Sequence, residues 1–163
     1  MIETKLTGKD LTHLYRAADM LCLQIGNTII IDSHRGEKVE SPEYRLHFQC
    51  QWRFVKEGKI LLASHDIYNP YNRDLEYDDS WNWDVFGREK EQSSVFDVRA
   101  KELINAFLPL KIQRLYFSDS SDLHIHFDKG IYFETFITCS TKREYYRLLD
   151  FHTGEHTLIF DVD

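Results

Sequence analysis

The sequence predicts a single α+β domain over residues 1–163, an antiparallel β-sheet built from two meanders with two helices packed against it. Several short segments alternate apolar and polar residues, as strands with one buried face do. Two other segments space their apolar residues as helices do. No repeat of a solenoid or propeller is present, and strands with few helices are typical of the α+β class. A chain of 163 residues, 42% of them hydrophobic, is long enough to bury one core.

The first element expected is a short helix from Thr7 to about Arg16. Thr7 and Asp10 stand three residues apart, as in a capping box with Asp in place of Glu. The apolar residues behind them have helical spacing: Leu11, Leu14, Tyr15 and Ala18.

The next residues predict the first meander. Alternation over 21–25 and a β-branched run over 28–31 indicate strands, with Gly26-Asn27 as a turn between them and a loop over 32–42. Glu43 to Val55 alternates most clearly and is predicted as one strand. A hairpin turn over 56–59 then leads to a partner strand over 60–64.

The second half predicts one helix and another meander. From His65 to about Gln92 the periodicity disappears, and a loop of that length inside a domain is commonly functional. Ser94 begins a helix that Pro109 ends. Strands are predicted over five segments: 111–117, 122–127, 131–138, 144–151 and 156–162.

The composition restricts the kinds of partner and the cellular compartment that we expect for this protein. Lys and Arg total 20 against 27 Asp and Glu, a formal charge of −7, which argues against nucleic-acid binding. No apolar run is long enough for a signal peptide or a membrane span, so we expect a cytoplasmic protein without a membrane partner. The three cysteines have no CxxC spacing and are expected to be reduced: Cys22, Cys50 and Cys139.

The residues from Asp74 to Asp84 are the main candidate site. They hold five acids, no Lys or Arg, and three large aromatics. Carboxylates repel one another unless they are solvated or meet cations, and Tyr and Trp are enriched at protein interfaces. We therefore predict a surface for a basic protein partner, made by Asp74, Glu76, Tyr77, Asp78, Asp79, Trp81, Trp83 and Asp84. The alternative is that the two tryptophans pin the loop to the core while the acids face water.

A second hypothesis is a metal-dependent or other enzyme that uses the strand carrying His124 and His126. Two imidazoles at i and i+2 share one face, and Asp122 or Asp128 would complete the ligands. The alternative is an ordinary solvated strand face, and the sequence nominates no third ligand from elsewhere. No GxSxG, P-loop or GxGxxG motif is present, so we expect no catalytic residues and no cofactor.

Two further interpretations stay open. A polar row on the 43–55 strand is suited either to an anion or acidic partner or simply to water: Arg45, His47, Gln49, Gln51 and Arg53. The third functional hypothesis is a homo-oligomeric scaffold in which the aromatic loop meets its own copy.

Three segments carry a family resemblance. The run from Arg16 to Gly26, the run from Leu46 to Arg53 and the later Glu144-Tyr145-Tyr146-Arg147-Leu148 resemble a family of small bacterial proteins with RAADM…LQ-G, LH-QC-WR and E-(W/Y)-R-L segments. The last segment departs from the family pattern by one extra residue after Glu144. The resemblance implies no particular activity. In general build the chain is similar to bacterial immunity proteins that neutralise polymorphic toxins, which implies an inhibitor.

Overall fold

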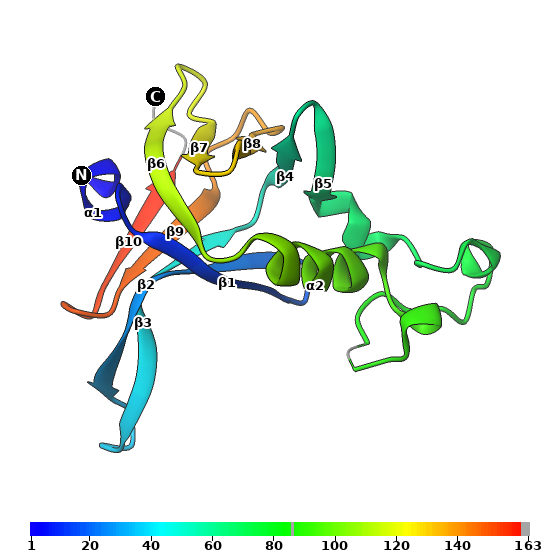
Figure 1. Cartoon of the computed structure of the whole chain (residues 1–163), viewed down its shortest axis with the longest axis horizontal. Helices are drawn as coiled ribbons and strands as arrows, with labels where there is room; N and C mark the ends of the chain where they lie inside the picture. The colour runs from blue at the N-terminus through cyan, green and yellow to red at the C-terminus, as the bar shows by residue number, and fades with distance from the viewer. Residues whose placement is uncertain (86, 161–163) are drawn as a thin grey trace.

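A computed structural model describes residues 1–85 and 87–160. Within them, ten strands form one antiparallel sheet accompanied by two α-helices and three short 3₁₀ helices, which confirms the α+β class (Figure 1). The helices are α1 (Ile2–Leu6), η1 (Ser64–Tyr68), η2 (Arg73–Leu75), η3 (Lys90–Gln92) and α2 (Val95–Phe107). The strands are β1 (Asp10–Ala17), β2 (Met20–Asp32), β3 (Lys38–Phe48), β4 (Gln51–Lys56), β5 (Lys59–Ala63), β6 (Leu110–Phe117), β7 (Leu123–Phe127), β8 (Ile131–Phe136), β9 (Glu144–Asp150) and β10 (Glu155–Phe160). None of the helices described is long and apolar enough to cross a membrane.

The sheet has two halves, β10-β9-β3-β2-β1 and β6-β7-β8-β4-β5, and the outer hairpin of each comes from the other half of the chain. The strand order is β10-β9-β3-β2-β1-β6-β7-β8-β4-β5. The β4–β5 hairpin, predicted to continue the first meander, pairs with β8, and the β9–β10 hairpin pairs with β3. The halves meet where β1 pairs with β6, through Asp10↔Lys111 and Leu11↔Leu110.

The sheet curls so that its two halves pack face to face. Four strands lie between β3 and β8 in the order, yet the ring centres of Phe48 and Phe133 are 4.9 Å apart. Both rings are fully buried. Burial of such aromatic rings is a large favourable contribution to folding, and it holds the curl closed.

The single strand predicted from Glu43 to Val55 is wrong, because the chain breaks at Gln49-Cys50 and crosses from β3 to β4. These strands belong to different halves, and only the curl brings their ends together. The two connecting residues preserve the alternation, so Leu46, Phe48, Trp52 and Phe54 are all buried. A period-two pattern therefore cannot reveal the break.

The helix predicted from Thr7 to Arg16 is also wrong, since most of that segment is β1. A β-bulge lies between Leu11 and His13, where β1 uses one residue more than β2. An extra residue shifts the face of those that follow. Leu11 and Leu14 are consequently both buried at a spacing of three, which imitates a helical stripe.

Gly26-Asn27 is a bulge rather than the predicted turn. Gly26 has φ +89°, and β2 continues through it to Asp32. The predicted loop over 32–42 shrinks to residues 33–37, the tip of a β2–β3 hairpin that projects from the body (Figure 1). Glycine suits a bulge with positive φ because it lacks a Cβ atom.

The predictions for the second half of the chain agree more closely with the structure. Ser94 caps α2 by accepting a hydrogen bond at Oγ from the Asp97 N–H at 3.1 Å, and Pro109 follows its end. The predicted strands from 111 to 151 correspond to β6–β9. The last prediction, 156–162, corresponds to β10 up to Phe160, and its final two residues lie outside the described residues.

Candidate functional site

The residues between η1 and α2 form a projecting segment, here called the arm (residues 69–93), which contains η2 and η3 (Figure 1). It extends from the body beside α2 and holds all eight residues predicted to contact a partner. Apart from the two short 3₁₀ helices and an isolated β-bridge between Pro70 and Ser94, its described residues are turns, bends and coil, as the lost periodicity indicates.

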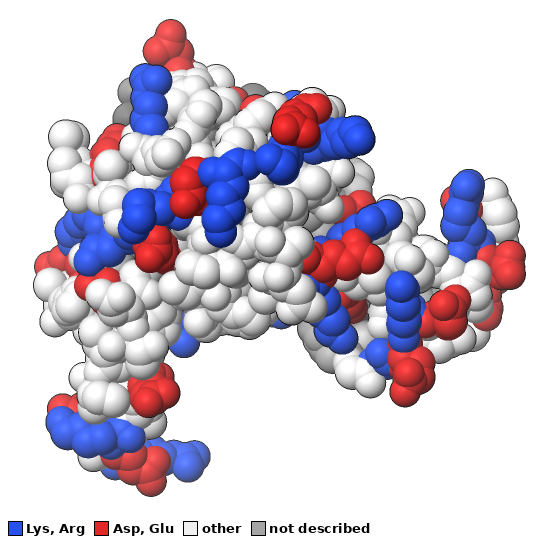
Figure 2. All heavy atoms as spheres, in the orientation of Figure 1, with Lys and Arg blue, Asp and Glu red and all other residues white. Residues whose placement is uncertain are grey.

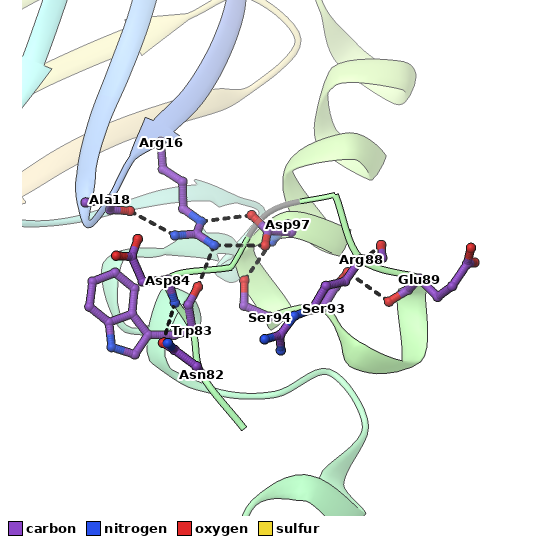
Figure 3. Close-up of polar contacts among 10 residues, drawn as sticks. All are labelled: Arg16, Ala18, Asn82, Trp83, Asp84, Arg88, Glu89, Ser93, Ser94 and Asp97. Atoms are coloured by element: carbon purple, nitrogen blue, oxygen red, sulfur yellow. Dashed lines mark hydrogen bonds and ion pairs between the residues drawn. The ribbon is translucent and has the colours of Figure 1, made fainter. Parts of the chain in front are cut away.

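Arg16 on β1 fixes the base of the arm (Figure 3). Its side chain is 1% exposed. Nε and Nη2 donate to the two carboxylate oxygens of Asp97 at 2.9 and 3.0 Å, Nη1 donates to the Ala18 carbonyl, and Nη2 also donates to the Trp83 carbonyl at 2.7 Å. A bidentate guanidinium–carboxylate pair has defined geometry. Arg16 therefore ties β1, α2 and the arm together.

The two arm tryptophans are partly buried, and one of them attaches the arm to the body. Trp83 packs at the edge of the core, with its ring at 5.1 Å, edge to face, from Tyr68 of η1. The Trp81 indole N–H donates to the Gln92 carbonyl at 3.0 Å. The pinning alternative therefore describes Trp83, whereas the hydrogen bond of the Trp81 indole is made within the arm.

The predicted acidic residues face solvent. Five carboxylates of the arm belong to exposed residues: Asp74, Glu76, Asp78, Asp79 and Asp84. None of them lies within 4.0 Å of a Lys, Arg or His nitrogen in the part of the chain that the structure describes. Tyr77 stands among them and is 91% exposed. The structure thus leaves these six predicted residues accessible on the arm.

Local contacts hold the tip of the arm in shape. The Ser80 hydroxyl and backbone N–H donate to Asp78 Oδ1 at 2.6 and 2.9 Å, and these hydrogen bonds lower the pKa of Asp78. Two cations of the arm have other contacts: Lys90 lies over the Tyr71 ring, and Arg88 donates to the Gln92 carbonyl. Figure 2 accordingly shows blue and red side chains interspersed along the arm.

The second hypothesis concerns the outer face of the other half of the sheet. There the cross-strand row is Tyr116, His124, Glu134 and Arg53. The His124 ring stacks on Tyr116 at 4.9 Å, and its Nδ1 lies 3.8 Å from Glu134, which pairs with Arg53 at 2.6 Å. His126 lies between the rings of Tyr116 and Tyr132.

The two aspartates expected beside these histidines have backbone partners instead. Asp122 accepts from the Ile137 N–H at 2.7 Å, and Asp128 accepts from the Lys111 N–H at 2.9 Å. Within the described residues, no three side chains of His, Cys, Asp or Glu come together as a metal site. Carboxylates that satisfy turn N–H groups are typical of structural positions.

Burial deactivates two of the three cysteines, whereas a hydrogen bond with Thr141 lowers the pKa of Cys139. Cys22, Cys50 and Cys139 are free thiols. Burial raises the pKa of Cys50 to about 12, so this thiol is protonated at neutral pH. Burial also raises the pKa of Cys22.

Sequence reasoning missed Arg16, the residue on which the placement of the arm depends. The helix predicted from Thr7 to Arg16 includes this residue, but the structure has a strand there. An arginine at an inward position of a strand could have indicated its role, since a buried cation requires a partner from elsewhere in the chain.

The polar row predicted on one strand is divided between the two halves of the sheet. Arg45 and His47 lie on β3, whereas Arg53 lies on β4 and pairs with Glu134.

A comparison of the chain with known protein families, with curated proteins and with solved structures finds no match.

Proposed function

We propose that this chain is a non-catalytic protein-binding domain, and that the arm docks its acidic tip onto a cationic surface of a protein partner. The observation that carries the proposal is the arrangement of the arm. Five exposed carboxylates, none of them within 4.0 Å of a cationic nitrogen among the described residues, share the arm with the exposed Tyr77, on a segment whose base is fixed by Arg16.

The fixed base supports binding because less conformational freedom is lost when the arm docks. Unpaired surface charges accelerate the encounter with an oppositely charged partner, and they do so more strongly at low salt. Tyr77 supplies a large amphipathic ring with few rotatable bonds. In this proposal the two tryptophans position the contact surface and are not its centre.

A partner of the expected kind is a toxin nuclease, whose active site binds phosphates and is therefore basic. The chain would then be an immunity-type inhibitor acting in the cytoplasm. An acidic surface that covers such a site blocks it by charge and by bulk, with no chemistry of its own.

Site-specific photo-crosslinking tests the proposal in cells that make the full chain. Benzoylphenylalanine at Tyr77 is expected to form one discrete adduct with a basic protein. The same photo-amino acid at Ile60, an exposed apolar residue of β5 that is 56% exposed, is the matched control and is expected to give no such adduct.

Charge reversal then tests the mechanism. Asp78→Lys with Asp79→Lys should slow association with the captured partner by at least about tenfold at low salt. Glu57→Lys with Asp119→Lys makes the same change in net charge at two turns outside the arm, and should have less than about a threefold effect. Equal effects of the two pairs, or the absence of an adduct at Tyr77, would contradict the proposal. An adduct with a second copy of the chain would indicate the homo-oligomeric scaffold instead.

A further inference from the structure

A groove lies where β9 stops short along the edge of β3. Strand β3 begins at Lys38, but β9 pairs with it only from Tyr44 to Phe48. The remaining edge faces the turn between β9 and β10, and the space between them has a volume of about 790 Å³. That volume is within the range of small-molecule sites. The β9–β10 turn lies on the side of the molecule away from the arm (Figure 1).

Strand β3 carries three buried polar atoms that lack a hydrogen-bond partner: Ser41 Oγ, Arg45 Nε and His47 Nε2. They are the only such atoms found among the side chains that the structure describes, those of residues 1–85 and 87–157. Ser41 and Arg45 line the groove, and His47 follows two residues along the same strand. Native proteins pair the great majority of their buried polar groups, so three unpaired atoms on one strand call for a functional explanation.

Arg45 has no anionic partner within the described residues, although the chain carries a charge of −7. Its guanidinium lies 5.1 Å from the centre of the Phe151 ring, which also lines the groove. A guanidinium has five donors and no acceptor, and its preferred partner is a planar oxyanion. The ligand that suits the Arg45 guanidinium is therefore an anion.

The neighbouring charges favour an anion with a single charge. Two acids of the groove already have cations, since Asp32 pairs with Lys38 and Asp150 pairs with Lys5. Glu40 has no cationic partner among the residues described, so it adds one negative charge to the lining. A dianion would be repelled more strongly than a monoanion.

The rest of the lining is partly polar, with Ser33, His34 and Thr153 among it, and partly apolar. Leu149 and Phe151 lie beside Arg45, and Ile30, Ile31 and Val39 line the hairpin side. Val39 is 37% exposed and shares one face of the hairpin with its cross-strand partner Ile31. An apolar ligand body would cover them and remove that surface from water.

We infer that this groove binds a small organic monocarboxylate, with the carboxylate on Arg45 and the apolar body against Leu149, Phe151 and the β2–β3 hairpin. The inference does not depend on the arm or on its partner. Both sites can be occupied together because they lie on different sides of the body.

Titration of the full chain with benzoate, followed by NMR at the Arg45 Nε–H signal, tests this inference. Benzoate is expected to bind saturably, and at least about tenfold more tightly than the neutral benzamide or inorganic phosphate. Phenyl phosphate separates the two kinds of anion, because it has the same ring and a dianionic head. It is expected to bind more weakly than benzoate.

Arg45→Gln should weaken benzoate binding by at least about tenfold. Arg114→Gln is the matched control, since Arg114 also lies over an aromatic ring, that of Tyr116 at 4.5 Å, but is exposed on the other half of the sheet. It should leave the affinity unchanged. If Arg45→Gln fails to fold, Arg45→Lys keeps the charge, loses the planar fork and should still weaken binding severalfold. Benzoate shifts that do not saturate, equal binding of benzamide, or equal affinities in the Arg45 and Arg114 variants would overturn the inference.

Discussion

The hydroxyl of Tyr146 on β9 lies 2.7 Å from the hydroxyl of Thr135 on β8, joining the two halves of the curled sheet through its core. The direction of the bond follows from its neighbours. The Leu123 N–H donates to Thr135 Oγ1, and Tyr146 donates to the Ser121 carbonyl. Thr135 must therefore donate to Tyr146, so that each hydroxyl gives one hydrogen bond and accepts one.

Tyr146→Phe is expected to lower the free energy of unfolding by about 1 to 3 kcal/mol, because it leaves buried groups of Thr135 and Ser121 without partners. Urea unfolding measures the change. Combination with Thr135→Val should give a coupling energy above about 0.5 kcal/mol. Tyr132→Phe, on the outer face of β8, is the control and should change stability by less than about 0.5 kcal/mol. Additive effects of the Tyr146 and Thr135 variants would contradict the hydrogen-bond chain.

Arg16→Met is expected to destabilise the protein by about 2 to 4 kcal/mol, since it leaves Asp97 and two carbonyl oxygens without their donor. The arm should lose its fixed base, and hydrogen exchange over residues 69–93 should accelerate more than exchange in β7. Arg99→Met is the control, because Arg99 forms an exposed pair with Glu102 on the same helix. That variant should cost less than about 0.5 kcal/mol. Unchanged arm exchange in the Arg16 variant would mean that the arm is held by other contacts.

Glu43 is expected to make stability depend on acid pH. Burial alone would raise the pKa of Glu43, but hydrogen bonds from Lys9, the Asn27 N–H and His152 outweigh burial and lower the pKa from 4.5 to about 2. Between these two values the unfolded chain binds the proton and the folded protein does not. Stability that is present above pH 4.5 is therefore lost as the pH falls towards 2, by roughly 2 to 3 kcal/mol for this group.

The Glu43→Gln variant removes this group from the titration. Its free energy of unfolding should start lower at pH 7 and decline less steeply below pH 4.5 than that of the natural chain, as measured by urea unfolding across the pH range. Glu40→Gln, two residues earlier and exposed, is the control and should reproduce the original pH profile. Parallel profiles for the natural chain and the Glu43 variant would refute the assignment.

Gly26→Ala is expected to be strongly destabilising for two separable reasons. The φ of +89° disfavours any L residue, and an added Cβ would lie 2.2 Å from Glu43 Oε2. Gly36→Ala isolates the first reason, because Gly36 has φ +76° and open space around the added atom. The Gly36 variant should cost about 1 to 2 kcal/mol, and the Gly26 variant at least about 2 kcal/mol more. Similar losses of unfolding free energy in both would show that Glu43 moves aside without penalty.

Local signals in the sequence were sufficient for some elements and misleading for others. The cap at Ser94 and the alternation of the strands after Pro109 depend on neighbouring residues, and both predictions agree with the structure. The β1 bulge and the break at Gln49-Cys50 depend on which strand lies alongside, information that no local pattern contains. The acidic tip was predictable from composition, whereas its attachment to Arg16, 67 residues before Trp83, was not.

The pairing of β1 with β6 has a consequence for how the protein is made. The paired residues of these two strands are about a hundred positions apart in the sequence. Strand β4 likewise pairs with β8, which is synthesised long after it. At ordinary translation rates several seconds separate the synthesis of β4 from that of β8. During that interval the nascent chain exposes unpaired strand edges and the aromatic rings of Trp52 and Phe54, which makes it a natural client for chaperones that shield such edges on the ribosome.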